Sequence, residues 1–157
     1  MNILDNLLSV NLDQMLSHLV LLVVAFALAL PIGWDREQSR RSFGLRTFPI
    51  VAVVSCGFML LGMQVIDSTD GEARVIQGII TGIGFIGGGA ILTNRDSVKG
   101  TSSAASIWNT GAIGVAVAFS RFEIAIVLSA LNFVTLRLLT GWVKEQIRDG
   151  VDGEGPE

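Results

Sequence analysis

Five apolar runs dominate this 157-residue chain and leave only short segments between them. A helix needs about 20 mostly apolar residues to cross the hydrocarbon core of a bilayer, with about 17 as a lower limit. Only 16% of the residues are charged, whereas a soluble domain carries about 25%. The sequence therefore predicts an all-α membrane protein, a bundle of five transmembrane helices at residues 15–32, 48–66, 75–92, 104–119 and 122–139.

The basic residues are distributed unevenly between the two sides of such a bundle. Of the 11 lysines and arginines, all except Arg74 and Arg121 fall on the side that also carries the C-terminus. An excess of Lys and Arg in short loops marks the cytoplasmic side of a membrane. We therefore expect the N-terminus outside and the C-terminus in the cytoplasm. We expect residues 141–157 to form a polar cytoplasmic tail that is disordered.

The fourth run is the weakest of the five, because its first half is polar. Residues 102–110 read SSAASIWNT. Backbone groups inside a membrane must form their hydrogen bonds internally, so this segment should be helical and packed inside the bundle. A re-entrant half-helix is the alternative.

A charged segment follows the first run. We expect Pro31 and Gly33 to end the first helix, which would place the charged residues after it at the membrane boundary. One interpretation is an anchor for anionic lipid headgroups, and another is a buried ion-pair network in which Asp35 pairs with Arg46 or another arginine. A third is direct binding of Mg²⁺ or Ca²⁺, with Asp35 and Glu37 as weak candidate ligands, although four nearby arginines make a poor cation site. The candidate charged cluster comprises Asp35, Arg36, Glu37, Arg46 and Thr47.

The third run, residues 75–92, is unusually rich in glycine. The pairs Gly78–Gly82 and Gly84–Gly88 have the G-x-x-x-G spacing that lets helix backbones approach closely in lipid. Because the glycines lie on more than one face, we expect this helix at the centre of the bundle, with Trp108 of the fourth run packed against it. Close packing within the chain, a dimer seam and a pore lining are the three interpretations. The candidate packing or pore residues are Gly78, Gly82, Gly84, Gly88 and Gly89.

Polar side chains share one face of the fourth run. Ser102, Ser106 and Asn109 recur at the spacing of a helix face. Polar groups inside a membrane usually face the bundle or a water-filled cavity, so these residues either form interhelical hydrogen bonds or line a polar pathway. In the fifth run Asn132 is a further candidate for an interhelical hydrogen bond, and Arg137 is expected to extend to the inner surface.

The two loops on the basic side have the same glycine spacing. Gly33 and Gly44 bracket the first loop, and Gly89 and Gly100 bracket the second at the same separation. Two copies of one helical hairpin in the same orientation would give this pattern, as in transporters built from parallel repeats. Chance resemblance is the alternative.

The sequence contains no visible constellation for catalysis or nucleic-acid binding. The net charge is −3, and no basic tract is present. The one cysteine, Cys56, and the one histidine, His18, lie far apart in the sequence and form neither a nucleophile–base pair nor a metal-ligand motif. We therefore expect no enzymatic activity, no cofactor and no nucleic-acid partner.

Two motifs, in this order, resemble the MgtC/SapB family of bacterial inner-membrane proteins. The first reads GWDRE at residues 33–37 and GLRT at residues 44–47. The second reads GIGFIGGGAI at residues 82–91, followed by GTSSAA at residues 100–105 and by Trp108. The resemblance covers about residues 20–140, with Trp34 in place of the usual small aliphatic residue and TSS in place of the usual LTT. We expect a short form without the soluble C-terminal domain of many members.

The resemblance implies a plasma-membrane protein linked to growth at low magnesium and to survival inside host cells. It also implies action by binding other membrane proteins, among them the membrane ATP synthase, rather than by pumping magnesium. Two hypotheses result. The first is a membrane module that binds other membrane proteins or itself, with a dimer favoured, and affects ion homeostasis. The second is a small cation or solute transporter or channel.

Overall fold

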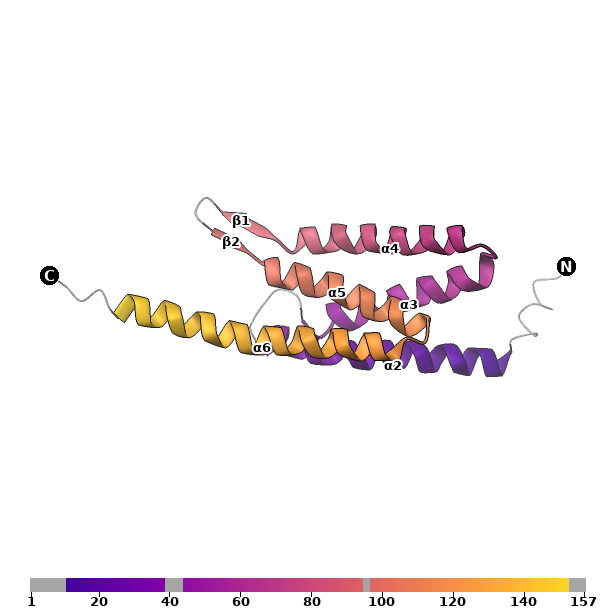
Figure 1. Cartoon of the computed structure of the whole chain (residues 1–157), viewed down its shortest axis with the longest axis horizontal. Coiled ribbons are helices and arrows are strands. Elements are labelled where there is room, and N and C mark those ends of the chain that lie inside the picture. Colours follow the sequence, from indigo (N-terminus) through magenta and orange to yellow (C-terminus); the bar gives the residue numbers. More distant parts are fainter. Residues whose placement is uncertain (1–10, 39–43, 95–96, 153–157) are drawn as a thin grey trace.

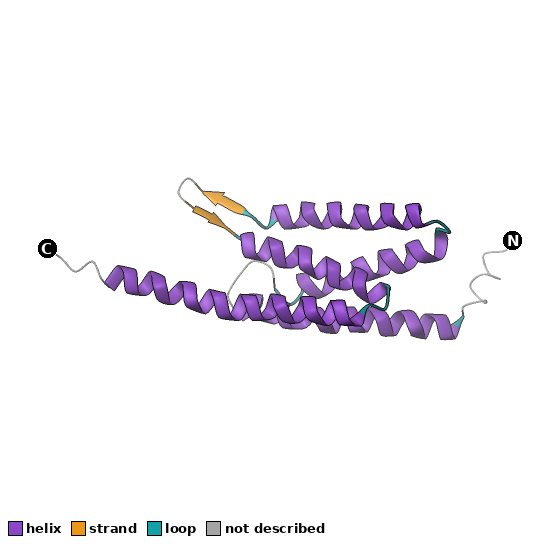
Figure 2. Ribbon diagram, viewed as in Figure 1, coloured by secondary structure: helices purple, strands orange, loops and turns teal. Residues whose placement is uncertain are grey.

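The computed structural model describes residues 11–38, 44–94 and 97–152, which form helices and one two-stranded hairpin (Figure 1, Figure 2). For residues 94, 97 and 140–152 only the backbone is described. The arginines at positions 40, 41 and 95, which support the predicted orientation, lie outside the described residues. The elements are α2 (Leu12–Gln38), α3 (Thr47–Val65), α4 (Thr69–Gly89), β1 (Leu92–Asn94), β2 (Ser97–Lys99), α5 (Thr101–Ala118) and α6 (Phe122–Asp152).

Three of the described helices are long and apolar enough to cross a membrane: α2, α3 and the Phe122–Leu139 part of α6. The 21-residue α4 and the 18-residue α5 do not meet the same standard of length and hydropathy. At 1.5 Å per residue they are roughly 31 Å and 27 Å long, close to the roughly 30 Å thickness of a hydrocarbon core. A helical membrane fold is therefore confirmed, and the crossing by all five helices stays a prediction.

The first described helix, α2, continues through Pro31, so the prediction that Pro31 and Gly33 end it was wrong. Proline leaves one carbonyl of the preceding turn without its helical partner, but membrane helices tolerate this where neighbouring helices supply compensating contacts. A Cβ on Gly33 would lie 3.2 Å from the Cα of Leu45, so the chain after the loop packs closely against α2. The continuation places Asp35 and Arg36 in the last turns of a helix.

The central helix of the bundle is α5, which contacts each of the other four helices. The glycine-rich α4 lies at one edge and packs mainly against α5 and α3 (Figure 1), so the prediction that it is central was wrong for the single chain. Only Ile79, Ile83 and Gly87 of α4 are buried. The physical reason is that α5 has small residues on two sides: Gly111 lies against Ile83 of α4, and Gly114 lies against α3.

The crossing of α3 and α5 is the most extensive helix contact in the bundle. A Cβ on Gly114 would collide with the carbonyl oxygen of Ala52 and would lie 2.9 Å from the Cβ of Ser55. Cys56 of α3 and Val117 of α5 have no exposed surface on this side. The two backbones therefore meet at van der Waals distance, and this contact forms the middle of the core.

The last helix, α6, packs against both α5 and α2. One hydrogen bond fixes it to α2, because the hydroxyl of Ser129 donates to the carbonyl oxygen of Leu28 at 2.6 Å. The helix reaches Asp152, although the sequence favours a disordered tail from residue 141. A helix that is already formed extends more easily than a new one nucleates, and the segment WVKEQIR at residues 142–148 has neither proline nor glycine.

The strands β1 and β2 form a short antiparallel hairpin in which Thr93 pairs with Val98. Gly100 follows the hairpin at φ 91°, a left-handed conformation that favours glycine. A Cβ at this position would also collide with the carbonyl oxygen of Ala90. The turn therefore returns the chain directly from α4 into α5. We call the end of the bundle that carries this hairpin, the last turns of α2 and the first turn of α5 the hairpin end.

Candidate functional site: a buried polar cluster at the hairpin end

A carboxylate is held between two arginines inside the hairpin end. Asp35 and Arg36 of α2 are 7% and 1% exposed. The Nη2 of Arg36 lies 2.9 Å from Oδ2 of Asp35, and the Nε of Arg137, from α6, lies 3.5 Å from Oδ1. Charges removed from water are stable only when they are paired and hydrogen-bonded, so the buried Asp35 and Arg36 depend on one another. The partners of Asp35 thus include Arg36 and Arg137, where the sequence suggested Arg46 or another arginine.

The ion pairs continue into α5 and back to α6 through hydrogen bonds. The Nη1 of Arg36 donates to Oγ of Ser102 at 3.2 Å. The hydroxyl of Ser106 lies 2.8 Å from the carbonyl oxygen of Ser102 and 3.0 Å from Oδ1 of Asn132, and its single proton can be donated to either acceptor. We call the connected set the polar cluster: Asp35, Arg36, Ser102, Ser106, Asn132 and Arg137.

Other polar side chains of the bundle bond to helix backbones close by. The amide of Asn109 donates to the carbonyl oxygen of Leu128 in α6 at 3.3 Å. The hydroxyl of Thr110 donates to the carbonyl oxygen of Ser106, one turn earlier in α5, at 2.7 Å. Ser106 and Asn109 therefore join α5 to α6, whereas Ser102 joins α5 to α2. The bond of Thr110 stays within α5.

Three buried polar atoms of the described residues have no hydrogen-bond partner: Nε of Arg36, Oγ of Ser103 and Nδ2 of Asn132. Two of the three belong to the polar cluster. A buried polar atom without a partner lowers stability by about 1–3 kcal/mol.

The rest of the predicted charged cluster lies outside the bundle. Glu37 is exposed and accepts a hydrogen bond from the backbone N–H of Leu45 at 3.2 Å. Arg46 is exposed immediately before α3, and Thr47 is the half-buried first residue of that helix. The structure therefore divides these five residues: Asp35 and Arg36 lie inside, whereas Glu37, Arg46 and Thr47 lie at the surface or near it.

The two candidate metal ligands do not converge. Asp35 faces arginines, and Glu37 bonds to a backbone N–H. Among the described residues no group of three or more His, Cys, Asp or Glu side chains could hold a metal ion. Two guanidinium groups beside a carboxylate also oppose the approach of a cation.

The glycines singled out in α4 do not pack against this chain. A Cβ on Gly78, Gly82, Gly84, Gly88 or Gly89 would meet no atom within 4 Å. The close contact of α4 is made by Gly87, whose Cβ would lie 3.2 Å from the carbonyl oxygen of Ala104.

Trp108 is 54% exposed, so the expected packing of its ring against the glycines is absent in the single chain. The ring instead borders a cavity of about 330 Å³ that is lined by α4, α5 and α6 residues, among them Ile79 and Ile83.

Sequence reasoning gave too little weight to α6. Asn132 and Arg137 supply two members of the polar cluster, and Ser129 fixes α6 to α2. Their signal was present, because Ser129 and Asn132 share a helix face with Leu136 in an otherwise apolar run. Neither their partner helix nor their bonds can be inferred from that spacing.

Comparison with known proteins agrees with the motif resemblance. A match to the MgtC family covers residues 22–144, which include every member of the polar cluster. The chain is 30% identical to protein SrpB of Synechococcus elongatus over 138 residues, which are 80% of this chain and 74% of that protein. No solved structure matches the chain.

Two further relatives are longer proteins. The chain is 34% identical to protein MgtC of Salmonella typhimurium over 112 residues, 71% of this chain and 48% of MgtC. It is 30% identical to the putative magnesium transporter YhiD of Escherichia coli over 127 residues, 76% of this chain and 59% of YhiD. The aligned part is thus about half the length of MgtC. The family match and these identities together show that this chain belongs to the MgtC family.

Proposed function

We propose that this chain is a plasma-membrane protein that supports magnesium and ion homeostasis by binding other membrane proteins, rather than by carrying ions itself. The observation that carries the proposal is that the intramembrane polar groups engage one another. Asp35 is held by two arginines, Ser106 bonds to Asn132, and Asn109 bonds to the α6 backbone. Groups arranged in this way tie helices together and are poorly placed to receive a hydrated cation in passage.

The charge at the cluster also favours a structural role. A path for Mg²⁺ needs several oxygen ligands free of competing positive charge. Arg36 and Arg137 both lie within 4 Å of the Asp35 carboxylate, so the charge of this acid, the one buried acid among the described residues of the hairpin end, is already neutralised. We propose that the hairpin end faces the cytoplasm, in keeping with the excess of basic residues on that side.

The test combines growth and transport. In a bacterial strain lacking this gene, expression of the chain should restore growth at limiting Mg²⁺. Asp35→Asn should reduce that rescue, whereas Asp67→Asn, at an exposed position of the α3–α4 turn, should not. Purified protein in liposomes should give no Mg²⁺ uptake above that of empty liposomes. Uptake that depends on the protein, or growth that is independent of the gene, would contradict the proposal.

A second candidate is a small cation or solute transporter. The specific support is the set of buried polar atoms that have no partner among the described residues, Nε of Arg36, Oγ of Ser103 and Nδ2 of Asn132, together with the description of YhiD as a putative magnesium transporter. On this reading Asn109→Ala should lower the flux of Mg²⁺, K⁺ or H⁺ into liposomes. Absence of all three fluxes would exclude it.

A further inference from the structure

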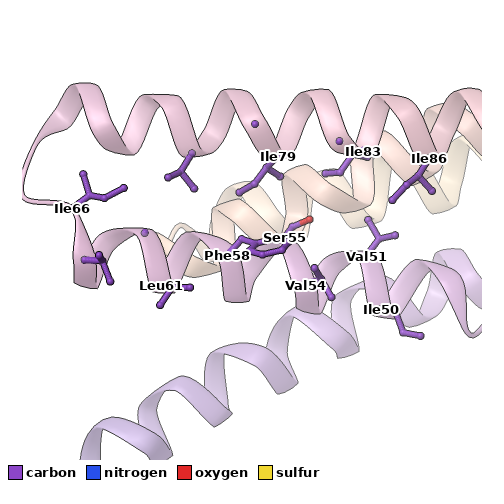
Figure 3. A pocket seen from close by; sticks show the side chains of 15 residues that line it. Ile50, Val51, Val54, Ser55, Phe58, Leu61, Ile66, Ile79, Ile83 and Ile86 are labelled. Carbon is purple, nitrogen blue, oxygen red and sulfur yellow. The ribbon is translucent and has the colours of Figure 1, made fainter.

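An apolar groove lies between α3 and α4 (Figure 3). Its volume is about 710 Å³. The α3 wall includes Val54, Phe58 and Leu61, which are 45%, 57% and 58% exposed. The α4 wall includes Gly78 and Gly82, where the helix backbone is bare. Among the described residues, no segment of this chain fills the groove.

The bundle contains an internal two-fold relation that gives this groove a counterpart. The buried residues of α3 recur in α5 with identical spacing: Phe48, Ala52, Cys56 and Met59 correspond to Ser103, Ile107, Gly111 and Gly114. The same holds for α2 and α4, where Ala25, Ala29, Gly33 and Arg36 correspond to Ile79, Ile83, Gly87 and Ala90. The contacts agree, since α2 touches α3 and α5, and α4 touches α5 and α3. The packing therefore supports a duplicated hairpin, although its register pairs Gly33 with Gly87, two positions from the Gly89 that the loop spacing pairs with it.

Under this relation the groove between α3 and α4 corresponds to the groove between α5 and α2, which α6 fills. Besides the ion pair of Arg137 with Asp35, three side-chain hydrogen bonds seat α6, and they involve Ser106, Asn109 and the carbonyl oxygen of Leu28. With the registers given above, these positions correspond to Val51, Val54 and Gly82. All three line the vacant groove. The groove between α5 and α2 thus holds a helix, whereas the corresponding groove between α3 and α4 is open.

The vacant groove differs from its counterpart in chemistry. Two polar anchors of the α6 seat, Ser106 and Asn109, are replaced by Val51 and Val54, and Leu28 is replaced by Gly82. A helix that enters this groove therefore needs no polar anchors there, and it can approach the α4 backbone closely.

We propose that the occupant is α4 of a second copy of this chain, in a two-fold dimer in which each α4 lies in the groove of its partner. One helix then supplies both the groove wall and the inserted surface, which is the self-complementarity that a two-fold interface requires. Gly78, Gly82, Phe85 and Gly89 form one stripe along α4. Phe85 is 86% exposed, and it lies between glycines that can receive the same ring from the partner.

The charges at the start of α4 are also self-complementary. Asp70 and Arg74 are both exposed, one helical turn apart. In the described part of the chain, no carboxylate lies within ion-pair distance of Arg74. Two parallel α4 helices related by a two-fold axis bring Arg74 of one copy near Asp70 of the other. The inference rests on the proposed function, in which the chain acts through helix contacts, and it names one such contact.

Cross-linking in native membranes tests the position of the partner. In a Cys56→Ser background, Gly82→Cys should give a covalent dimer with a short bifunctional maleimide. Ala130→Cys, on the exposed face of α6, should give little. Equal cross-linking at the two positions would overturn the proposal, because it would reflect random collision.

Assembly in lipid provides the second test. Labelled protein in vesicles of defined protein-to-lipid ratio should count as two subunits by single-molecule photobleaching. Gly82→Leu should raise the protein density needed for half dimerisation about tenfold or more, whereas Ala130→Leu should not change it. A Cβ at Gly82 meets nothing within 4 Å, so circular dichroism of the variant should match that of the wild type.

Two outcomes would overturn the proposal. They are a monomer at every density, which leaves lipid or another protein's helix as the occupant, and a dimer that Gly82→Leu does not weaken. Neither outcome bears on the liposome flux or on growth at limiting Mg²⁺. Failure of the dimer can therefore be distinguished from failure of the proposed function.

Discussion

Arg36 carries a full positive charge at a position with 1% exposed surface. Its guanidinium pairs with the Asp35 carboxylate and donates to the Ser102 hydroxyl, so two polar groups on two helices depend on one side chain. Arg137 meets the same carboxylate from the other side, but its side chain is 53% exposed and also lies 5.7 Å from the ring of Phe133. The two arginines carry the same charged group but differ in burial, so we expect them to contribute differently to the free energy of unfolding.

Arg36→Met should lower the free energy of unfolding by about 3 kcal/mol or more, because it leaves a buried carboxylate without its nearer arginine. Arg137→Met should lower it by less than about 1 kcal/mol, because exposed ion pairs are weakly stabilising. Unfolding in mixed micelles, followed by circular dichroism, measures both values. Equal losses in the two variants would mean that burial does not distinguish the arginines.

At the level of elements, close approach depends on where a glycine faces, rather than on how many glycines a helix has. Gly114 of α5 lies against the α3 backbone, and Gly87 of α4 lies against the α5 backbone. At Gly78 and at the remaining glycines of the GIGFIGGG segment, an added Cβ would meet no atom of the chain within 4 Å. In lipid, where apolar surface alone does not hold helices together, the facing contacts hold the monomer and leave the other faces for partners.

Gly114→Ala should destabilise the monomer by about 1–3 kcal/mol, because the added methyl would overlap the Ala52 carbonyl oxygen and approach the Cβ of Ser55. Gly84→Ala makes the same chemical change where no atom lies within 4 Å, so it should leave stability unchanged or slightly higher. The same micelle unfolding experiment compares the pair. A loss at Gly84 as large as that at Gly114 would contradict the packing described here.

The described residues form a bundle of five helices and one short strand hairpin, and we infer that two helical hairpins of this bundle are equivalent. Helices α3 and α5 cross at its centre, α2 and α4 flank them, and α6 closes one of the two equivalent grooves. Three of these elements meet the length and hydropathy of a membrane span by themselves. Helices α4 and α5 lie beside them in the same bundle, so we expect them to cross the membrane as well.

Labelling of single cysteines tests this topology. In a Cys56→Ser background, Asp67→Cys and Arg121→Cys should react with a membrane-impermeant maleimide on intact cells. Arg46→Cys and Lys99→Cys should react only after the membrane is opened, since α4 and α5 place Lys99 on the opposite side from both turns. If Asp67→Cys and Lys99→Cys react to the same extent on intact cells, α4 does not cross the membrane.

The sequence by itself determined that the chain is a membrane protein, that it is helical, and to which family it belongs. Apolar runs of membrane length are a property of composition, and they predicted the approximate positions of all five described helices. The motifs GWDRE and GLRT identified the family that the comparison then showed. The polar residues Asp35, Arg36, Ser106 and Asn109 were found because polar groups are rare in such runs.

Only the tertiary structure decided which helix is central, which arginines hold Asp35, and which glycines face a neighbour. Each of these is a relation between segments far apart in the chain, and helical periodicity gives a face without naming what lies against it. The continuation of α2 through Pro31 has the same origin, because surrounding helices outweighed the local preference of proline. The groove between α3 and α4 is recognised as open only by comparison with the groove between α5 and α2, which α6 fills.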